Sequence, residues 1–359
     1  MRKKKIIVAM SGGVDSSVAA HILKKQGHEL IGVFLHFWKD SDMGGGGRIE
    51  NKCCSLEALM DARRVCRKIG MPLYTTNFSE EFKENVVDNF LSEYARGNTP
   101  NPCVQCNRFV KLGLLIKKAR ELGFDYVASG HYVSNEKHKE EFKLYRGKDE
   151  NKDQSYFLYT LNQERLQRLI FPLGKYTKDK VRQMAEKAGL PVAQKSESQE
   201  ICFITGKSHN KFLEKYLKLK KGSIKTFDDK VRGEHKGLPL YTIGQRRGIE
   251  IGGTGPFYAC KMNYKTNTLY VVDDVDDKRL FSDNLKAKDV NWISGIEPKL
   301  PFKCEAVIRY RHKPVACEIL KNKRGVYEVK FNKDQRAITP GQSVVFYNKD
   351  EVLGGGIIR

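Results

Sequence analysis

A glycine-rich turn near the start of the chain limits the possible folds more than any other feature. The apolar residues 4–10 predict a β-strand, the turn 11–17 (Ser-Gly-Gly-Val-Asp-Ser-Ser) follows it, and residues 18–25 predict a helix. Residues 30–38 then predict a second strand. Strand, helix and strand in this order form a βαβ unit, which is typical of a parallel sheet. We therefore expect an α/β fold whose N-terminal part is a doubly wound parallel sheet.

The sequence pattern changes twice farther along the chain, which predicts three domains. Alternating helices and strands continue to about residue 205, and segments punctuated by glycine follow to about residue 280. From about residue 285, short alternating strands such as 303–310 and 315–320 are separated by turn residues, as in a small β-barrel. We predict a catalytic domain over residues 1–207, a small central domain over 208–282 and a C-terminal β-barrel domain over 283–359.

The chain is strongly basic, which suggests a polyanionic partner. Its 359 residues include 65 Lys and Arg against 43 Asp and Glu, a formal net charge of +22. Basic side chains release counterions from nucleic-acid phosphates, although a lysine-rich surface can also have no binding role. No run of ~20 apolar residues predicts a membrane span, and no signal-peptide pattern is present. We expect a cytoplasmic protein with nucleic acid as a candidate partner and no membrane partner.

The glycine-rich turn has the features of a phosphate-binding loop. Gly12 and Gly13 let the backbone approach a phosphate closely, and the N–H groups at the start of the following helix point at that anion. The loop serines add hydroxyl donors, and Asp15 suits a Mg²⁺ ion that bridges it to a pyrophosphate. The turn is not a Walker A loop, because no Gly-Lys-Ser/Thr follows. The alternative is an ordinary capped turn between a strand and a helix.

Two of the cysteine segments are candidates for chemistry. Residues 101–107 (Asn-Pro-Cys-Val-Gln-Cys-Asn) predict a helix that starts at Pro102, with Cys103 and Cys106 on one face. A helix N-terminus favours thiolate, so these residues suit a redox pair or a metal site, the alternative being two buried structural cysteines. Cys202, in residues 201–204 (Ile-Cys-Phe-Ile), would by itself be a core residue and gains importance only beside Cys106.

The other cysteines predict no chemistry. The total of nine is odd and the expected compartment is reducing, so a disulfide framework is not expected. Cys53, Cys54 and Cys66 lack histidines at zinc-site spacing, and we interpret them as structural.

Seven separated segments together resemble the tRNA-specific 2-thiouridylase family of the PP-loop ATP pyrophosphatases. The segments are 11–17, 98–107, 129–132, 151–159, 201–204, 244–248 and 354–358. They cover nearly the whole chain in the family's order. The resemblance implies ATP-dependent 2-thiolation of the wobble uridine of tRNA. ATP would adenylate the uracil 2-oxygen and yield AMP and pyrophosphate, and sulfur would displace the AMP.

The resemblance also implies roles for individual residues. With Mg²⁺, ATP would be bound by Ala9, Met10, Ser11, Gly12, Gly13, Val14, Asp15, Ser16, Leu35 and Gly130. The anticodon arm of tRNA would contact Asn101, Pro102, Cys103, His131, Lys152, Asp153, Gln154, Arg309, Tyr310 and Gln342, with His131 near the reacting base. The catalytic set would be Asp15, Cys103, Cys106 and Cys202.

Two routes for the sulfur step stay open. In the first, Cys202 carries a persulfide supplied by a cysteine desulfurase or a sulfur-relay protein, and Cys106 is the partner thiol. Many family members carry Asp where this chain has Cys103, so three thiolates are available here. In the second route they hold a [4Fe-4S] cluster with one open iron. We favour the persulfide.

Two other functions are alternatives to thiolation. A PP-loop ligase acting on a small metabolite would need neither the paired cysteines nor the positive charge. A non-catalytic RNA-binding module would not bind ATP.

Overall fold

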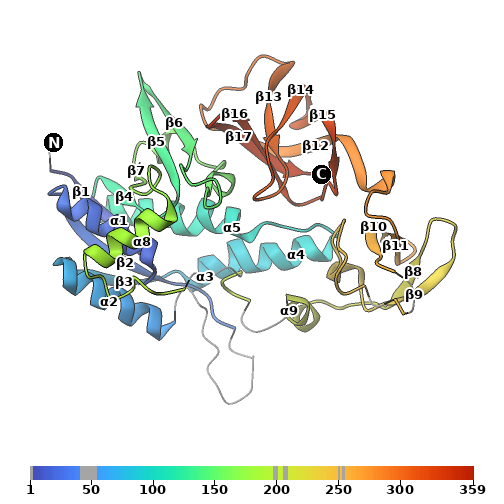
Figure 1. Ribbon diagram of the computed structural model, residues 1–359, viewed down its shortest axis with the longest axis horizontal. Helices are drawn as coiled ribbons and strands as arrows, with labels where there is room; N and C mark the ends of the chain where they lie inside the picture. The colour runs from blue at the N-terminus through green and yellow to red at the C-terminus, as the bar shows by residue number, and fades with distance from the viewer. Residues whose placement is uncertain (1–2, 41–54, 197–200, 205–208, 250, 253–254) are drawn as a thin grey trace.

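The computed structural model describes residues 3–40, 55–196, 201–204, 209–249, 251–252 and 255–359. The glycine-rich segment 44–47 and the cysteines at positions 53 and 54 lie outside these residues. Figure 1 shows an α/β domain at one end of the molecule, a small sheet at the other end and a β-barrel between them on the upper side. Within the described residues, no helix has the length and apolar character needed to cross a membrane.

Five parallel strands form the predicted N-terminal sheet, in the order β3-β2-β1-β4-β7. Their bounds are β1 Lys5–Met10, β2 Glu29–His36, β3 Leu73–Asn77, β4 Tyr126–Ala128 and β7 Leu169–Ile170. The central strand β1 is apolar after its first residue, Lys5, and its Ile6, Ile7 and Val8 are completely buried. A strand that is buried on both faces needs helices on both faces, as in a doubly wound fold.

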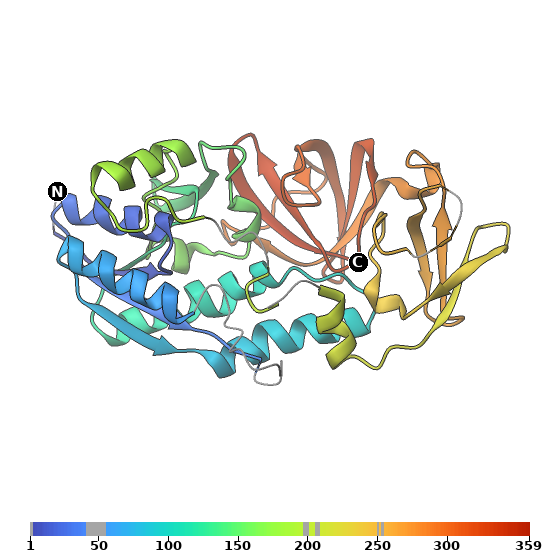
Figure 2. The same cartoon turned by 60° about the horizontal axis from the view of Figure 1, so that its bottom comes forward.

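Helices cover both faces of this sheet (Figure 2). α1 (Val14–Lys25) packs against α2 (Leu56–Ile69) and α8 (Lys178–Lys187), whereas α6 (Leu115–Glu121) contacts β1 and β4. Ser55 caps α2 by accepting a hydrogen bond from the Ala58 N–H, and Gly70 ends it in the left-handed conformation.

Two long helices each contain a π-helical stretch. The first consists of α3 (Ser79–Phe82), the π-helical Lys83–Asp88 and α4 (Asn89–Ala95). The second consists of α5 (Pro102–Gln105), the π-helical Cys106–Leu114 and α6. The periodicity of the sequence predicted only continuous helices. π-Helical turns are rare in proteins overall, but those that occur are often found at functional sites. Here one begins at Cys106.

The α/β domain contributes a hairpin to the C-terminal barrel. β5 (Val133–His138) pairs with β6 (Glu141–Arg146), and β6 pairs with β17 (Glu351–Ile358), with Leu144 opposite Val352. Three short elements follow, the 3₁₀ turn Ser155–Phe157, α7 (Gln163–Leu166) and β7. The two domains therefore share one eight-stranded sheet, which ties their positions together.

Six strands close the C-terminal barrel, because β12 pairs with both β15 and β17. The barrel strands are β12 Phe281–Trp292, β13 Phe302–Val307, β14 Val315–Lys323, β15 Val326–Arg336, β16 Ser343–Asn348 and β17. Its core includes the fully buried Ile319, Val329, Val344 and Phe346.

The central region contains one helix and a four-stranded sheet of order β10-β11-β8-β9. Its elements are α9 His209–Tyr216, β8 Gly222–Lys225, β9 Val231–His235, β10 Tyr258–Asn263 and β11 Thr268–Val272. Short 3₁₀ turns lie at Leu238–Leu240 and Lys278–Leu280.

Candidate nucleotide and thiol sites

The glycine-rich turn lies at the carboxyl ends of β1 and β4, the place where ligands bind in open α/β sheets. Gly12 has φ +69°, and a Cβ there would lie 2.1 Å from the Ala58 carbonyl oxygen. A Cβ on Gly130, directly after β4, would lie 2.8 Å from the backbone of Asp15 and Ser16. Only glycine allows the turn to approach α2 and β4 this closely.

The other predicted ATP residues lie at the same edge of the sheet. Ala9 and Met10 end β1, and Leu35 is the penultimate residue of β2. Gly13 is the N-cap of α1 and makes no side-chain cap, so the positive end of the helix dipole faces the turn. The structure therefore brings these positions together around one edge.

Serine hydroxyls hold the turn in shape. The Ser16 hydroxyl donates to the Gly13 carbonyl at 3.1 Å and accepts from the Ser11 N–H at 3.2 Å. The Ser17 hydroxyl also donates to Gly13, at 2.8 Å, and its side chain is fully buried. Ser17 therefore shapes the loop rather than facing a ligand, whereas Ser11 is exposed.

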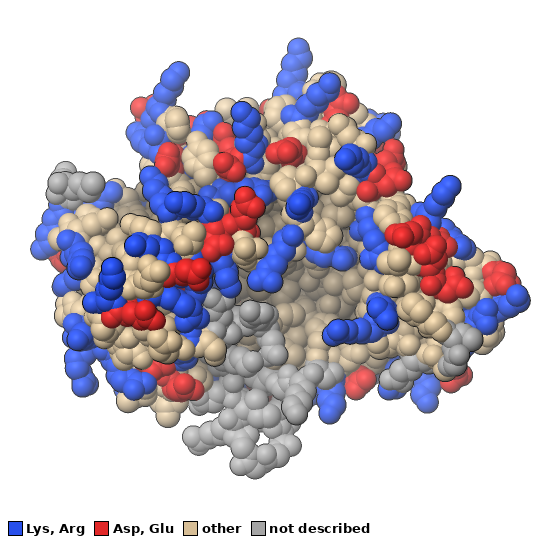
Figure 3. Space-filling model, viewed as in Figure 1, with Lys and Arg blue, Asp and Glu red and all other residues tan. Residues whose placement is uncertain are grey.

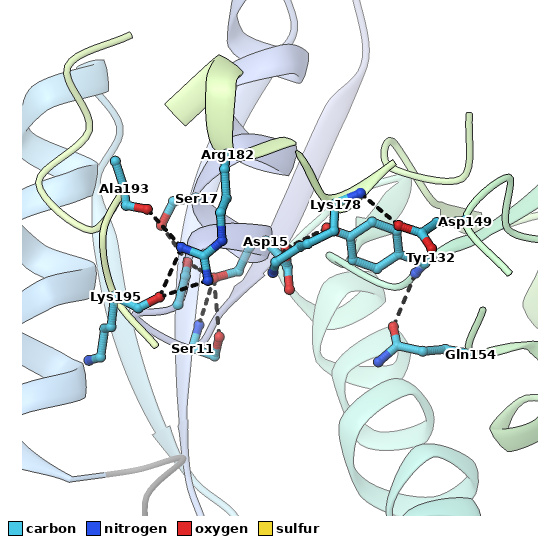
Figure 4. Close-up of polar contacts among 12 residues, drawn as sticks. Ser11, Asp15, Ser17, Tyr132, Asp149, Gln154, Lys178, Arg182, Ala193 and Lys195 are labelled. Carbon is cyan, nitrogen blue, oxygen red and sulfur yellow. Dashed lines mark hydrogen bonds and ion pairs between the residues drawn. The ribbon is translucent and has the colours of Figure 1, made fainter. Parts of the chain in front are cut away.

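Asp15 joins the turn to two distant segments (Figure 4). One carboxylate oxygen accepts from the Tyr132 hydroxyl and from the Lys178 ammonium, both at 2.7 Å. The Lys178 side chain is only 8% exposed, and that of Asp15 is 33% exposed. The Lys178 N–H donates to Asp149 at 2.9 Å. A nearly buried ammonium thus lies beside the glycine-rich turn.

Sequence reasoning missed Lys178. It is the first residue of α8, directly after the N-cap Thr177. A cation at this position is unfavourable to the helix dipole, so its presence after a capping threonine was the available signal. That cost is offset here by the ion pair with Asp15.

The segment before Cys202 is fixed by a second charged network (Figure 4). Arg182 on α8 donates to the carbonyls of Ala193 and Lys195. The Lys195 ammonium pairs with the buried Asp61 of α2, as does Arg64. Burial opposes ionisation of Asp61, but the hydrogen bonds from these two cations hold its pKa below the ordinary value.

The predicted catalytic cysteines differ in their surroundings. Cys106 is buried at the start of the π-helical stretch, Cys103 is exposed and Cys202 is half-buried. Phe203, beside Cys202, packs edge-on against the rings of Phe82, Phe90 and Phe212. Among the residues that the structure describes, no group of three or more His, Cys, Asp or Glu could hold a metal ion. In this arrangement the three cysteines do not fit an iron–sulfur cluster.

The chain that leads into the cysteine helix is held by contacts from both the barrel and the central region. The Gln342 amide donates to the Thr99 carbonyl at 2.8 Å and to that of Pro100 at 3.4 Å. The Thr99 N–H donates to Pro340 at 2.8 Å, and its hydroxyl lies 3.1 Å from that of Thr242. The barrel and the central region thus position the residues just before Asn101, the N-cap of α5.

His131 is buried at the end of β4. Its Nδ1 lies 2.8 Å from the Ser129 hydroxyl. Burial, assisted by the positive charge of Lys111, lowers the pKa of His131 to about 3. His131 is therefore neutral near pH 7 and able to accept or donate one hydrogen bond at each ring nitrogen.

Several predicted tRNA-binding residues already have contacts within the protein. Asp153 accepts from the Gly147 N–H and from Ser155, and Gln154 accepts from the Tyr132 N–H at 3.1 Å. Lys152 is half-buried in the same loop. These bonds shape the loop that follows β6.

Two more of these residues lie on the barrel side. Arg309 donates to the Ala337 carbonyl and to the Thr339 hydroxyl. The Tyr310 ring centre is 4.5 Å from that of Phe157.

A groove of about 710 Å³ separates the loop after β6 from the barrel loop that follows β13. Its lining includes Arg146, Lys148, Asp153, Tyr310, Arg311 and Lys313. The structure thus brings two predicted tRNA contacts, Asp153 and Tyr310, to one groove, whose lining has equal numbers of acidic and basic side chains because Glu136, Glu150 and Asp350 also line it. Figure 3 shows that this face of the molecule is hollowed near its middle, with Lys and Arg side chains around the hollow.

Three family models match the chain. They are described as tRNA methyl transferase HUP domain over residues 4–206, tRNA methyl transferase PRC-barrel domain over 210–273 and Aminomethyltransferase beta-barrel domain over 282–358.

The chain is 45% identical to a protein of Geobacillus thermodenitrificans named tRNA-specific 2-thiouridylase MnmA, over 99% of this chain and 94% of the relative. A Clostridium perfringens protein of the same name is also 45% identical, over 100% of this chain and 99% of the relative. The similarity thus includes both cysteine segments and the glycine-rich turn.

Solved structures show weaker likeness, on which we base no argument. The U34-tRNA thiolase NcsA from Methanococcus maripaludis with its [4Fe-4S] cluster has 20% identity and a TM-score of 0.35, covering 56% of this chain and 62% of its own. A 4-thiouridine synthetase in complex with RNA and ATP has 20% identity and a TM-score of 0.37, covering 59% and 49%.

Proposed function

Because this chain belongs to the tRNA-specific 2-thiouridylase family, we propose that it uses ATP to replace the 2-oxygen of the wobble uridine in tRNA with sulfur. The observation that carries the proposal is the 45% identity to relatives of that name along the whole chain. The phosphate-binding turn and the cysteine helix supply the two kinds of group that this chemistry needs.

In the first step, the turn binds the phosphates of ATP. The N–H groups at the start of α1 and the exposed Ser11 face the phosphates, and Lys178 neutralises part of their charge. Mg²⁺ prefers oxygen ligands and often combines one carboxylate with phosphate oxygens, so the partly exposed Asp15 fits this ion. When bound, Mg²⁺ would neutralise charge on the leaving pyrophosphate. The uracil 2-oxygen attacks the α-phosphorus, and pyrophosphate leaves.

In the second step, sulfur displaces AMP. A Cys202 persulfide attacks carbon 2 of the uracil with its terminal sulfur, and AMP leaves. The Cys106 thiolate then attacks the Cys202 Sγ, which breaks the persulfide S–S bond and leaves one sulfur on the base. The resulting Cys106–Cys202 disulfide is reduced by an external thiol before the next turnover. Cys103, which is exposed on the same helix as Cys106, assists this sulfur transfer.

The tRNA is held by basic surface and by the loops around the groove. Lys152, Arg309 and Tyr310 lie on these loops, and most contacts there are to phosphates. The target uridine leaves its stack to reach the turn and Cys106. We assign Gln342 and Asn101 to positioning the cysteine helix next to that base.

The proposal includes no step through an iron–sulfur cluster. Iron and acid-labile sulfide are measured per chain after strictly anaerobic purification, with Cys103→Ala alongside. We expect no stoichiometric iron in either protein. Iron that is present in the wild type and lost in Cys103→Ala would replace the persulfide route by the cluster route.

The test of the function itself is AMP release and thiouridine formation with a tRNA transcript, ATP and a persulfide donor. We expect one AMP per thiouridine and no AMP without tRNA. AMP release that needs a small metabolite in place of tRNA would support a ligase instead. Failure to bind ATP would leave only an RNA-binding module.

A further inference from the structure

Two cysteines face each other on the barrel, away from the sites described above. Cys304 on β13 and Cys317 on β14 are direct partners in the antiparallel register. Their Sγ atoms are 3.6 Å apart, and 13 positions separate them along the chain. Cys317 is 3% exposed, whereas Cys304 is half-buried. The pair thus has two sulfurs in contact and one member accessible to a small reagent.

We propose that Cys304 and Cys317 are an oxidation site, which forms a reversible disulfide when the protein meets a peroxide. This site is separate from the thiolation chemistry and does not depend on it. The strands need not move far, because paired positions on adjacent antiparallel strands already lie ~4.5–5.5 Å apart between Cα atoms, within the range of a disulfide. Rotation of the two side chains closes the remaining gap.

The reaction has two steps. The Cys304 sulfur attacks one peroxide oxygen and the O–O bond breaks, so that a sulfenic acid forms; the thiol proton passes to the other peroxide oxygen, which leaves as the first water. The Cys317 sulfur then attacks the Cys304 sulfur, the S–O bond breaks, and the second water leaves as the S–S bond forms. Two thiols lose two electrons and two protons, and one peroxide becomes two waters.

The surroundings of the pair decide which sulfur reacts first. The hydrogen bond with Cys304, followed by burial, raises the pKa of the Cys317 thiol. Cys317 therefore stays protonated, and Cys304, which is half-buried where Cys317 is 3% exposed, is the member that the oxidant reaches first. Both side chains pack against the barrel core, which keeps them opposite each other.

The bond would cross-link β13 and β14 in the middle of their ladder, with two residue pairs on either side. β13 and β14 flank the loop 308–314, which carries Arg309 and Tyr310 and lines the groove. A disulfide here restricts the unfolded chain and therefore stabilises the barrel.

The experiment maps the bond in the full-length protein. Reduced protein is treated with a small excess of hydrogen peroxide, quenched with N-ethylmaleimide and digested with trypsin. Cleavage after Arg309 and Arg311 separates residues 304–309 from residues 312–321 unless the disulfide joins them. We expect the joined peptide as the main product at these positions, two hydrogens lighter than its parts, and its loss on treatment with dithiothreitol.

Matched variants and an unfolded control sharpen the result. Cys304→Ser should abolish the joined peptide, whereas Cys66→Ser, at a buried cysteine whose pKa is raised to about 12 by burial, should leave it unchanged. Protein unfolded in urea should give a yield of the joined peptide that is lower by roughly tenfold or more, because the fold no longer holds the two sulfurs in contact. Oxidation should also raise the Tm of the barrel on the order of 5 °C.

Two outcomes would overturn the proposal. One is recovery of the two peptides separately as maleimide adducts after peroxide has oxidised other cysteines. The other is equal yield of the joined peptide from folded and unfolded protein. The second comparison needs only the wild type, so it decides the matter even if Cys304→Ser does not fold.

Discussion

The nucleotide turn and the thiol segments are held in place by different kinds of contact. Around the turn, directional bonds dominate, with Ser16 bonded to Gly13 and Asp15 bonded to both Tyr132 and Lys178. Around the thiols, apolar packing dominates, with Cys106 in the core and Cys202 beside a cluster of aromatic rings. Charged groups with fixed partners form a site before the ligand arrives, whereas packed segments can slide or repack.

This difference leads to different expectations for substitutions in the two regions. Changes at the turn should stop the ATP step and everything after it. Changes at the thiols should stop only sulfur transfer.

Asp15→Ala should lower both tRNA-dependent AMP release and thiouridine formation by about 10³-fold. The substitution removes a ligand at the phosphate loop and leaves the nearly buried Lys178 ammonium without its carboxylate partner. Binding of tRNA, measured by filter retention, should stay within about threefold of the wild type. Thiouridine at wild-type levels would exclude Asp15 from the mechanism.

Cys106→Ala should abolish thiouridine formation but leave the rate of AMP release within about threefold of the wild type. Cys106 enters only after the base is adenylated, so the first step does not need it. Cys66→Ala, at another buried cysteine, is the control and should form thiouridine normally. If Cys106→Ala lost AMP release as well, the two regions would not be separable.

Lys178→Met should lower kcat/KM for ATP by about 10- to 100-fold, mostly through KM, because it removes a cation beside the phosphate loop. The control is Lys180→Met, since Lys180 is exposed on the same helix. Circular dichroism checks that both variants fold. Equal effects of the two substitutions would mean that general surface charge, and not the Lys178–Asp15 pair, supports ATP binding.

Gln342→Ala should slow sulfur transfer by about three- to tenfold and leave KM for ATP unchanged. It removes the hydrogen bonds to Thr99 and Pro100, each with a net value of about 1 kcal/mol, that hold the entry to the cysteine helix. Single-turnover thiolation with a preloaded persulfide measures the step. A purely tRNA-binding role would instead weaken tRNA affinity with no change in the single-turnover rate at saturation.

His131 should make stability depend on pH. Its pKa is about 3 in the folded protein against 6.5 for an ordinary histidine, so between these values the unfolded chain binds a proton that the folded chain does not. The contribution of His131 to the free energy of unfolding is complete above pH 6.5. It is lost as pH falls toward 3, by up to ~1.4 kcal/mol per pH unit. The check is urea unfolding of wild type and His131→Gln at pH 7, 6 and 5. The difference between them should shrink as pH falls, and a constant difference would contradict the burial of a neutral His131.

Local patterns predicted much of the fold. The run of β1, the turn and α1 has a strong local signature, and so do the short strands of the barrel. The same approach missed the π-helical stretch at Cys106–Leu114, because one extra residue per turn barely alters the apolar spacing. It also gave no sign that residues 133–146 of the predicted catalytic domain form a hairpin that pairs with the barrel sheet.

The candidate site likewise contains parts that a local motif predicts and parts that depend on contacts between distant residues. Gly12 and Asp15 were predictable, because the turn between β1 and α1 is a continuous motif. The Asp15–Lys178 ion pair was not, because the two residues are 163 positions apart. The bond from Gln342 to Thr99 spans 243 positions.

The sequence by itself determined the phosphate-binding turn, the spacing of Cys103 and Cys106 and the strong positive charge, since each depends only on neighbouring residues or on composition. The tertiary structure alone decided that Lys178 neutralises Asp15, that barrel residues position the cysteine helix, and that Cys304 meets Cys317. Such contacts follow from how strands and helices pack, and a one-residue change of register would remove them without changing any local pattern.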